Sequence, residues 1–280
     1  MQHHSLIQRI VERLKTTPSL KAIVLGGSYA AGRQKPDSDI DLGLYYYERQ
    51  PLDIDHIRAI AAELNDTSEV TATPLGGWGR WVNGGAWLTI QGQRVDFLYR
   101  NIDFVSHILN ESTAGKFQSD YWQQPAYGFH SYMYCTETRI CQPLYDPEHI
   151  ISDLKARVTT YPHQLKHAII KDFLWSARFT LDNTYKLAAR GDVYIVTGCI
   201  ARALHCLVQV VYALNESWYI SEKRVAEDVL SFGIQPERFL ERTYAILGAV
   251  GHSSTQLQGT LQKTEQLYSE MAALSRSASQ

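Results

Sequence analysis

Residues 25–44 read LGGSYAAGRQKPDSDIDLGL, and this stretch decides the fold. The run before it, residues 21–25, is short, apolar and β-branched, which predicts a buried strand that stops at the paired glycines. A second strand is predicted over residues 39–44, where acidic and aliphatic residues alternate. Because side chains alternate across a strand, Asp39 and Asp41 share one face and the aliphatic residues share the other. One face of the sheet is therefore core, and the other carries charge.

The glycine turn between these strands suits an anion. Gly26 and Gly27 let a phosphate approach the main chain, because neither has a side chain. If a helical turn starts at Ser28, its free N–H groups, its hydroxyl and the positive end of the helix dipole all face that anion. The turn is a candidate phosphate site.

Asp39 and Asp41 are closely spaced like charges. On a strand, Cα atoms two residues apart are separated by roughly 6.6 Å. With about 6 Å between the charges and an effective dielectric of about 20, the repulsion is on the order of 3 kcal/mol. A divalent cation reverses the sign of this interaction, and Mg²⁺ takes oxygen ligands from carboxylates and phosphates. The pair therefore indicates a metal site.

A third carboxylate lies on a later predicted strand. Residues 91–99 read QGQRVDFLY, a turn followed by a strand with Val95 and Phe97 on one side and Asp96 on the other. Asp96 is the candidate third ligand. Arg100 falls on the same side as Asp96, where it either contacts a phosphate or neutralises the acids.

The order Gly27, Ser28, ten residues, then Asp39-x-Asp41 resembles the signature of the DNA polymerase β-type nucleotidyltransferase superfamily. The resemblance implies that Gly27 and Ser28 hold the triphosphate of an NTP. It also implies that the acids at 39 and 41 bind two Mg²⁺ ions, with Mn²⁺ as an alternative. Asp96 would complete one metal site and deprotonate the acceptor.

The segment 75–87, LGGWGRWVNGGAW, has an unusual composition of dense glycines and three tryptophans. Glycines this dense do not favour a regular core element, and tryptophans are too large to be left exposed without a reason. We expect Trp87 to cover the sheet as part of a hairpin. For Trp78 and Trp81, hairpin packing and a pocket wall for a base or acceptor both remain open.

The second half of the chain has helical periodicity. Long helices are predicted over residues 163–189 and 193–214, followed by the segment LNESWYISEKR at 214–224. This segment resembles one in small-molecule nucleotidyltransferases such as the aminoglycoside-modifying group. By that resemblance Lys223 holds triphosphate charge, and Tyr219 and Asn215 shape the site. The alternative is a helix-turn-helix in which Lys223 is solvated.

These patterns predict an α+β protein. A small mixed-sheet nucleotidyltransferase domain is expected over residues 1–115, an irregular connection over 116–146 and a helical bundle over 147–280. The formal charge of −2, with no dense run of Lys and Arg, argues against an extended nucleic-acid surface. The sequence shows no uninterrupted apolar run of membrane-spanning length and no signal peptide, so we expect no membrane association and a cytoplasmic protein.

The sequence thus predicts an Mg²⁺-dependent enzyme that transfers a nucleoside monophosphate from an NTP, expected to be ATP, to an acceptor hydroxyl with release of pyrophosphate. The expected acceptor is a small molecule. Two alternatives stay open: a toxin-type enzyme that modifies RNA or protein, and a non-catalytic nucleotide-binding regulatory protein. A homodimer through the helical half is a further open question.

Overall fold

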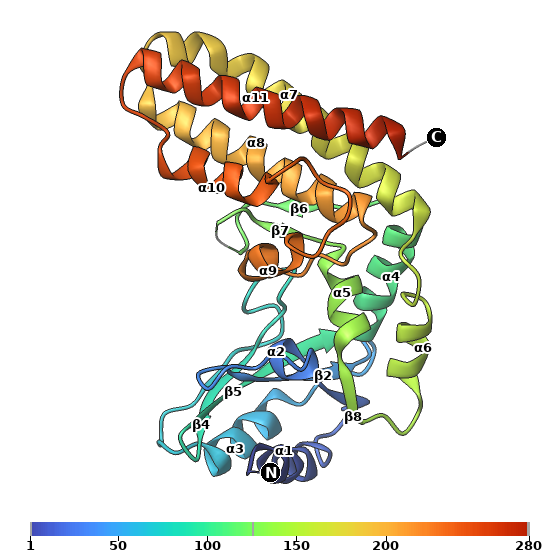
Figure 1. The fold of residues 1–280 in the computed structure, drawn as a ribbon. Helices are drawn as coiled ribbons and strands as arrows, with labels where there is room; N and C mark the ends of the chain where they lie inside the picture. The colour runs from blue at the N-terminus through green and yellow to red at the C-terminus, as the bar shows by residue number, and fades with distance from the viewer. Residues whose placement is uncertain (1, 125, 279–280) are drawn as a thin grey trace. The chain divides into compact units, whose positions relative to one another are not determined.

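The computed structural model describes residues 2–124 and 126–278, which form two compact units (Figure 1). The first unit runs to Ser112 and also includes Phe117–Gln123 and Gly128–Thr160. The second contains Thr113–Lys116, Gln124–Tyr127 and the chain from Tyr161 onward. The first unit is built on a mixed sheet and the second on helices, so the fold is α+β.

A six-stranded sheet organises the first unit in the order β3-β4-β5-β2-β1-β8. Strands β2 and β5 are parallel, and every other neighbouring pair is antiparallel. The strands are β1 (Ala22–Leu25), β2 (Ile40–Tyr46), β3 (Thr71–Ala72), β4 (Gly85–Ile90), β5 (Gln93–Asn101) and β8 (Gln142–Tyr145).

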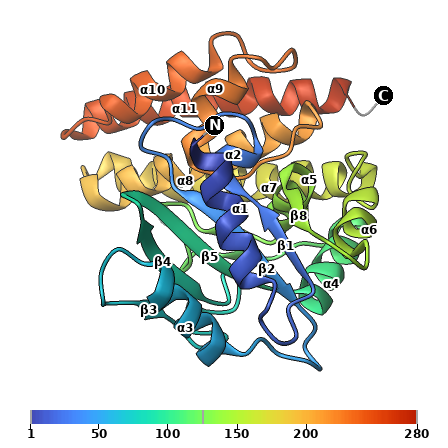
Figure 2. The same cartoon turned by 90° about the horizontal axis from the view of Figure 1, so that it is seen from below.

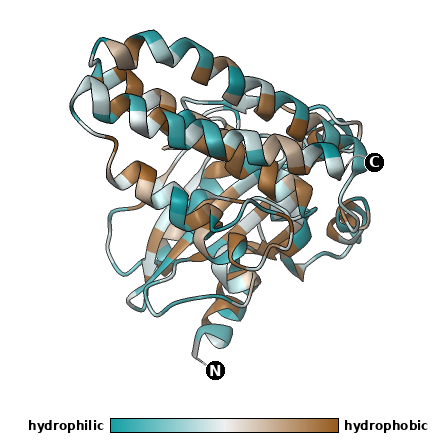
Figure 3. Cartoon of the chain, turned by 45° about the horizontal axis from the view of Figure 1, so that its top comes forward, coloured by the Kyte–Doolittle hydropathy of each residue, from teal (hydrophilic) through white to brown (hydrophobic). Residues whose placement is uncertain are grey.

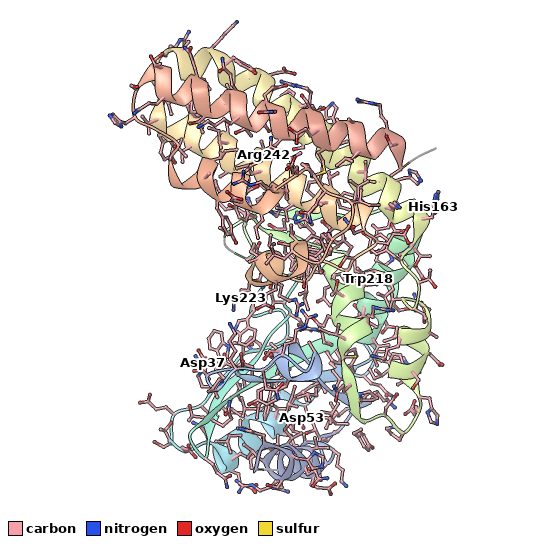
Figure 4. All side chains as sticks on the ribbon, in the orientation of Figure 1. Asp37, Asp53, His163, Trp218, Lys223 and Arg242 are labelled. Atoms are coloured by element: carbon pink, nitrogen blue, oxygen red, sulfur yellow. The ribbon has the colours of Figure 1, made fainter. Side chains whose placement is uncertain are left out.

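Two amphipathic helices cover one face of this sheet, α1 (Gln2–Leu14) and α3 (Ile54–Leu64) (Figure 2). The carboxylate of Asp53 caps α3 by accepting a hydrogen bond from the His56 N–H (Figure 4). Aliphatic and aromatic residues from both helices and from alternate positions of the strands make one buried core. The opposite face of β2 and β5 carries the acids Asp41 and Asp96, which do not belong to this core.

Residues 116–146 differ from the irregular connection that the sequence predicts. They contain the two-stranded sheet of β6 (Ser119–Asp120) and β7 (Phe129–His130), the helix α5 (Met133–Ile140) and the edge strand β8. Strand β8 includes Pro143 and shows no alternation of apolar and polar residues, so its sequence gives no strand signal. Helix α6 (Ile150–Ala156) follows, and α4 (Ile102–Thr113) precedes them in the chain.

The second unit is a helical bundle. Its long helices α7 (His163–Ala189) and α8 (Val193–Leu214) confirm the predicted ranges at both ends. Hydrophilic and hydrophobic residues alternate along the long helices (Figure 3), as is typical of amphipathic helices. An ion pair between Arg242 and Glu270 joins the last two helices (Figure 4). The remaining elements are η1 (Glu222–Arg224), α9 (Val225–Val229), α10 (Phe239–Gly248) and α11 (Ser254–Ser277).

Helix α8 is the central element of the bundle and packs against α7, α10 and α11. It is also long and apolar enough to meet the length and composition expected of a membrane span, with 56% of the most apolar window buried in the structure. A buried core helix has the same two properties.

Candidate active site

Asp41 and Asp96 are direct neighbours across the parallel strands β2 and β5. Paired residues on adjacent strands point to the same face, and the strands lie about 4.8 Å apart. Leu42 and Phe97, the next pair along, belong to the buried core on the other face. The alternation predicted from the sequence is therefore confirmed, and the register places two carboxylates side by side.

Asp39 lies just before β2 and carries the third carboxylate. Its Oδ1 is 2.5 Å from Nε of Arg94, whose side chain is 63% exposed. The same guanidinium donates a hydrogen bond from Nη2 to the main-chain oxygen of Asp37 (2.9 Å). Arg94 is thus a solvent-exposed counter-ion of Asp39.

The carboxylates at 41 and 96 have strongly perturbed acidities. Burial raises the pKa of Asp41 to about 7, and repulsion by Asp96 adds to the effect. Burial likewise raises the pKa of Asp96 to about 6, with a contribution from the charge of Asp39, while Arg94 acts in the opposite direction. Perturbed carboxylates that share one face are a feature of functional sites.

The glycine turn meets these acids directly. Helix α2 (Gly27–Ala30) starts one residue after β1, and the N–H of Gly26 donates to the main-chain oxygen of Asp41 (2.8 Å). Gly27 has φ +56°, and a Cβ on it would lie 2.8 Å from Cγ of Asp41. Only a residue without a side chain lets the turn approach the carboxylate this closely. The first N–H groups of the turn, which have no partner inside the helix, lie next to the acids.

The donor set of this site suits a divalent cation. Three carboxylates belong to this part of the sheet, two of them with raised pKa values, and the buried Oδ1 of Asp39 is ion-paired with Arg94. Within residues 2–124 and 126–278, no three His, Cys, Asp or Glu side chains already stand in metal-ligand geometry. Like charges repel when no cation is present, so an unassembled arrangement is expected. The residues fit Mg²⁺ by their chemistry, and Asp39 must leave Arg94 to join them.

Comparison with known families agrees with this geometry. The family model described as "Polymerase beta, Nucleotidyltransferase" matches residues 8–73, which include the glycine turn, Asp39 and Asp41. This region is a polymerase β-type nucleotidyltransferase domain. A second family model, "Domain of unknown function (DUF4037)", matches residues 133–224.

A solved structure provides a further, weaker comparison. It is described as a nucleotidyltransferase-like protein from Exiguobacterium sibiricum 255-15, and it is 12% identical with a TM-score of 0.46. The alignment covers 93% of this chain and 72% of that one. No curated protein matches the chain.

Arg100 of β5 lies beyond the matched residues, and its side chain is buried. Its Nε and Nη2 lie 2.6 and 3.0 Å from the two carboxylate oxygens of Glu137, and Nη1 donates to the main-chain oxygens of Val82 and Tyr99. Burial lowers the pKa of this guanidinium, but Glu137 outweighs burial and the net pKa is raised. The guanidinium makes four hydrogen bonds here, and its charge acts to lower the pKa of Asp41, in keeping with the predicted neutralising role; its contact with a phosphate stays a prediction.

The tryptophans of the glycine-rich segment have different roles. Trp81 is 3% exposed, stacks on Phe129 and donates from Nε1 to Asp120 (3.1 Å), so it is a packing residue. Trp87 is 55% exposed, which corrects the prediction that it covers the sheet. It stacks on Trp78 with ring centroids 4.6 Å apart.

The predicted residues of the helical unit have varied surroundings. Asn215 follows the last residue of α8, and its amide is hydrogen-bonded to the main chain of Val211 and Ile234; its part in shaping the site stays a prediction. Tyr219 is 3% exposed and its ring meets Tyr212 edge-on. Lys223 is exposed on η1 (Figure 4), and its contact with a triphosphate stays a prediction.

Sequence reasoning missed three residues at the site. Arg94 lies two residues before Asp96 on the same face of β5, so the alternation that located the acid also pointed to it. Glu137 lies on α5, in the segment where no element was predicted. Trp87 was assigned to packing because its pairing with Asp96 depends on the β4–β5 register, which composition does not reveal.

Proposed function

We propose that this protein transfers a nucleoside monophosphate from an NTP to a hydroxyl group of a small molecule. The observation that carries the proposal is the pairing of Asp41 with Asp96 across β2 and β5, directly beside the glycine turn. The oxygen of the acceptor attacks the α-phosphorus, the bond from that phosphorus to the bridging oxygen of the β-phosphate breaks, and pyrophosphate leaves.

The three acids are the residues that would hold Mg²⁺. When bound, the cations neutralise phosphate charge and stabilise the attacking and leaving oxygens. Asp41 lies against the glycine turn, and Asp39 and Asp41 would hold a cation next to the triphosphate. Asp96 is the proposed proton acceptor for the attacking hydroxyl, because a carboxylate with a pKa of about 6 is a better base than an ordinary one.

The glycine turn supplies the proposed phosphate contacts. Gly27 and Ser28 open α2, so their N–H groups and the Ser28 hydroxyl can face the triphosphate. Gln142 fixes the other end of α2 by donating from Nε2 to the oxygen of Ala30 (2.7 Å). The turn is therefore held in position before any ligand arrives, and preorganised donors of this kind account for much of phosphoryl-transfer catalysis.

The small-molecule acceptor is proposed from the charge of the chain. The formal net charge is −2, and 27 Lys and Arg residues are offset by 29 Asp and Glu residues. A protein that tracks a nucleic-acid backbone needs a concentrated excess of positive charge. Binding one NTP and one small acceptor does not require such an excess of positive charge.

The experiment is a transfer assay with ATP and other NTPs labelled at either the α- or the γ-phosphate, with Mg²⁺ and a panel of hydroxylated acceptors. We expect α-label to move to the acceptor. Movement of γ-label alone would identify a kinase and refute the proposal. Asp41→Asn should abolish transfer, whereas the isosteric control Asp55→Asn, at an acid that is 91% exposed on α3, should not change it.

A further inference from the structure

Trp87 is the feature of the acidic face that the proposed chemistry leaves unexplained. Every other residue of β4 on that side of the strand is small or polar, namely Gly85 and Thr89, while Ala86, Leu88 and Ile90 point into the core. A tryptophan that served only packing would be buried, yet this side chain is 55% exposed. One side of the indole rests on Trp78, with the ring planes inclined by 21°.

The main chain of Trp78, whose ring stacks on Trp87, is fixed by two hydrogen bonds. The main-chain N–H of Trp78 donates to the main-chain oxygen of Asn83 (2.8 Å), and its main-chain oxygen accepts from Nε2 of Gln123 (2.7 Å). Its ring covers Gly85, where a Cβ would lie 2.8 Å from the indole carbon Cζ3. The same Cβ would lie 1.9 Å from the main-chain oxygen of Phe97, so both the pairing of β4 with β5 and the position of the ring require glycine here. The two tryptophans form a supported aromatic surface, which we call the Trp78–Trp87 platform.

The sheet register places this platform next to the acids. Trp87 pairs directly with Asp96, and Asp96 pairs with Asp41 on the next strand. Beyond Asp41, on the β1 side, lies Gly26 of the phosphate turn, which bonds to it. The row on this face therefore runs from the turn through Asp41 and Asp96 to Trp87. Adjacent strands are about 4.8 Å apart, so the indole begins one strand from Asp96.

The in-line direction of the reaction indicates which end of this row of residues would bind the leaving group and which would bind the acceptor. In a displacement at phosphorus the attacking and leaving oxygens lie roughly in line, on opposite sides of the α-phosphorus. With the proposed phosphate contacts, the leaving pyrophosphate would lie at the glycine turn, at one end of the row. The attacking hydroxyl would then approach from the other end, on the side of Asp96, and the molecule that carries it would extend over β4.

We propose that the Trp78–Trp87 platform is the acceptor subsite, and that it binds the flat face of a ring in the same small molecule that carries the reacting hydroxyl. This inference rests on the proposed function, because it uses the in-line direction of nucleotidyl transfer. Two sources share that chemistry: a nucleoside, whose base stacks on the indole, and a cyclic polyol or sugar, whose C–H face packs on it.

The first experiment follows the ¹⁹F NMR signals of the platform and does not require catalytic turnover. The chain has six tryptophans, so protein grown with 5-fluorotryptophan gives six ¹⁹F signals. Those of Trp78 and Trp87 are assigned with Trp78→Phe and Trp87→Phe. The protein is saturated with Mg²⁺ and α,β-methylene ATP and then titrated with adenosine in one arm and with methyl glucoside or inositol in the other.

We expect the ring compound of one arm to shift the Trp87 signal after the nucleotide has bound, and to leave Trp175 unchanged. Trp175 is a matched reporter, since it is 67% exposed and stacks on Phe179 in the helical unit. The inference is overturned if neither arm shifts Trp87. It is also overturned if the nucleotide alone produces the full shift, because the platform then belongs to the donor. If Mg²⁺ and the nucleotide do not bind at all, the proposed function itself fails.

The second experiment is kinetic. With an acceptor that receives α-label, Trp87→Ala should raise KM for the acceptor at least tenfold and leave KM for the NTP within twofold of wild type. The KM of Trp87→Phe for the acceptor should lie between those of wild type and Trp87→Ala, because a smaller ring keeps part of the stacking. Trp175→Ala should behave as wild type. An equal rise in both KM values, or no rise for the acceptor, would contradict the assignment.

Discussion

Gly27 and Asp41 fit against each other so closely that no side chain fits at position 27. A Cβ there would lie 2.8 Å from Cγ of the Asp41 carboxylate, and the backbone has φ +56°. The glycine turn and the Asp41 carboxylate are therefore a single structural unit. A change at the glycine must move the acid or distort the turn.

Gly27→Ala should reduce nucleotidyl transfer at least a hundredfold, since the new methyl group displaces the Asp41 carboxylate. Backbone strain at positive φ should also cost about 1 to 2 kcal/mol of folding free energy. The control is Gly32→Ala, at φ +66° with nothing within 4 Å of the added Cβ. It should show the strain in thermal unfolding and retain activity. Equal loss of activity in both variants would attribute the effect to strain alone.

The raised pKa values make stability depend on pH when metal is absent. The folded-state pKa of Asp41 is about 7 and that of Asp96 about 6, above the usual 3.8, so the folded state binds more protons between pH 4 and 7. Stabilisation by these groups is present below pH 4 and is lost as the pH rises through 6 to 7. Asp41→Asn should therefore match wild type near pH 4 and melt several degrees higher at pH 8.

Calorimetric melting curves of the metal-free proteins at pH 4, 6 and 8 test this dependence. Asp55→Asn, at an acid on the surface of α3, serves as the control and should track wild type at every pH. A constant difference between wild type and Asp41→Asn across the range would show that the acid is not buried against its neighbours. Mg²⁺ binding should in turn release protons below pH 7.

Arg94 competes with metal for Asp39. Arg94→Gln should tighten Mg²⁺ binding several-fold at pH 8.5, where Asp96 is ionised with or without the neighbouring cation. Isothermal titration measures the change. Arg58→Gln removes another exposed arginine that pairs with an acid, on α3, and should leave the affinity unchanged. Weaker Mg²⁺ binding in Arg94→Gln would mean that the arginine supports the site.

The Arg100–Glu137 pair should be structural. Arg100→Met leaves a carboxylate without its partner, and breaking a buried pair costs about 3 kcal/mol or more. Glu137→Gln should destabilise for the same reason. The double variant should be more stable than the sum of the two single losses predicts, as urea unfolding would measure. Additive losses would show that the two side chains act independently.

The local parts of the fold could be predicted from the sequence. Strands β2 and β5 are indicated by the short stretches in which acids alternate with apolar residues, around Asp41 and Asp96. Helices α7 and α8 are indicated by long apolar periodicity that is interrupted at Gly191 and Asp192. Strand β8 could not be predicted, because it forms through pairing with β1, more than a hundred residues earlier in the chain. Its own four residues show no preference that would reveal it.

The acids of the candidate site could be found in the same way, but their neighbours could not. Asp39 and Asp41 lie in one short motif, and Asp96 is the one acid of the predicted strand, between the apolar residues Val95 and Phe97. That Trp87 stands beside Asp96 follows from antiparallel register, and that Glu137 encloses Arg100 follows from the placement of α5. Both depend on tertiary contacts, which local periodicity does not encode.

The central claim is that Asp39, Asp41 and Asp96 form the cation site for a nucleotide. Its most direct test is Mn²⁺ binding by electron paramagnetic resonance in the presence of α,β-methylene ATP, which needs no acceptor. We predict that wild type and Asp55→Asn bind Mn²⁺ together with the nucleotide, and that Asp41→Asn and Asp96→Asn weaken Mn²⁺ binding at least tenfold. Equal Mn²⁺ affinity in all four proteins would contradict the account.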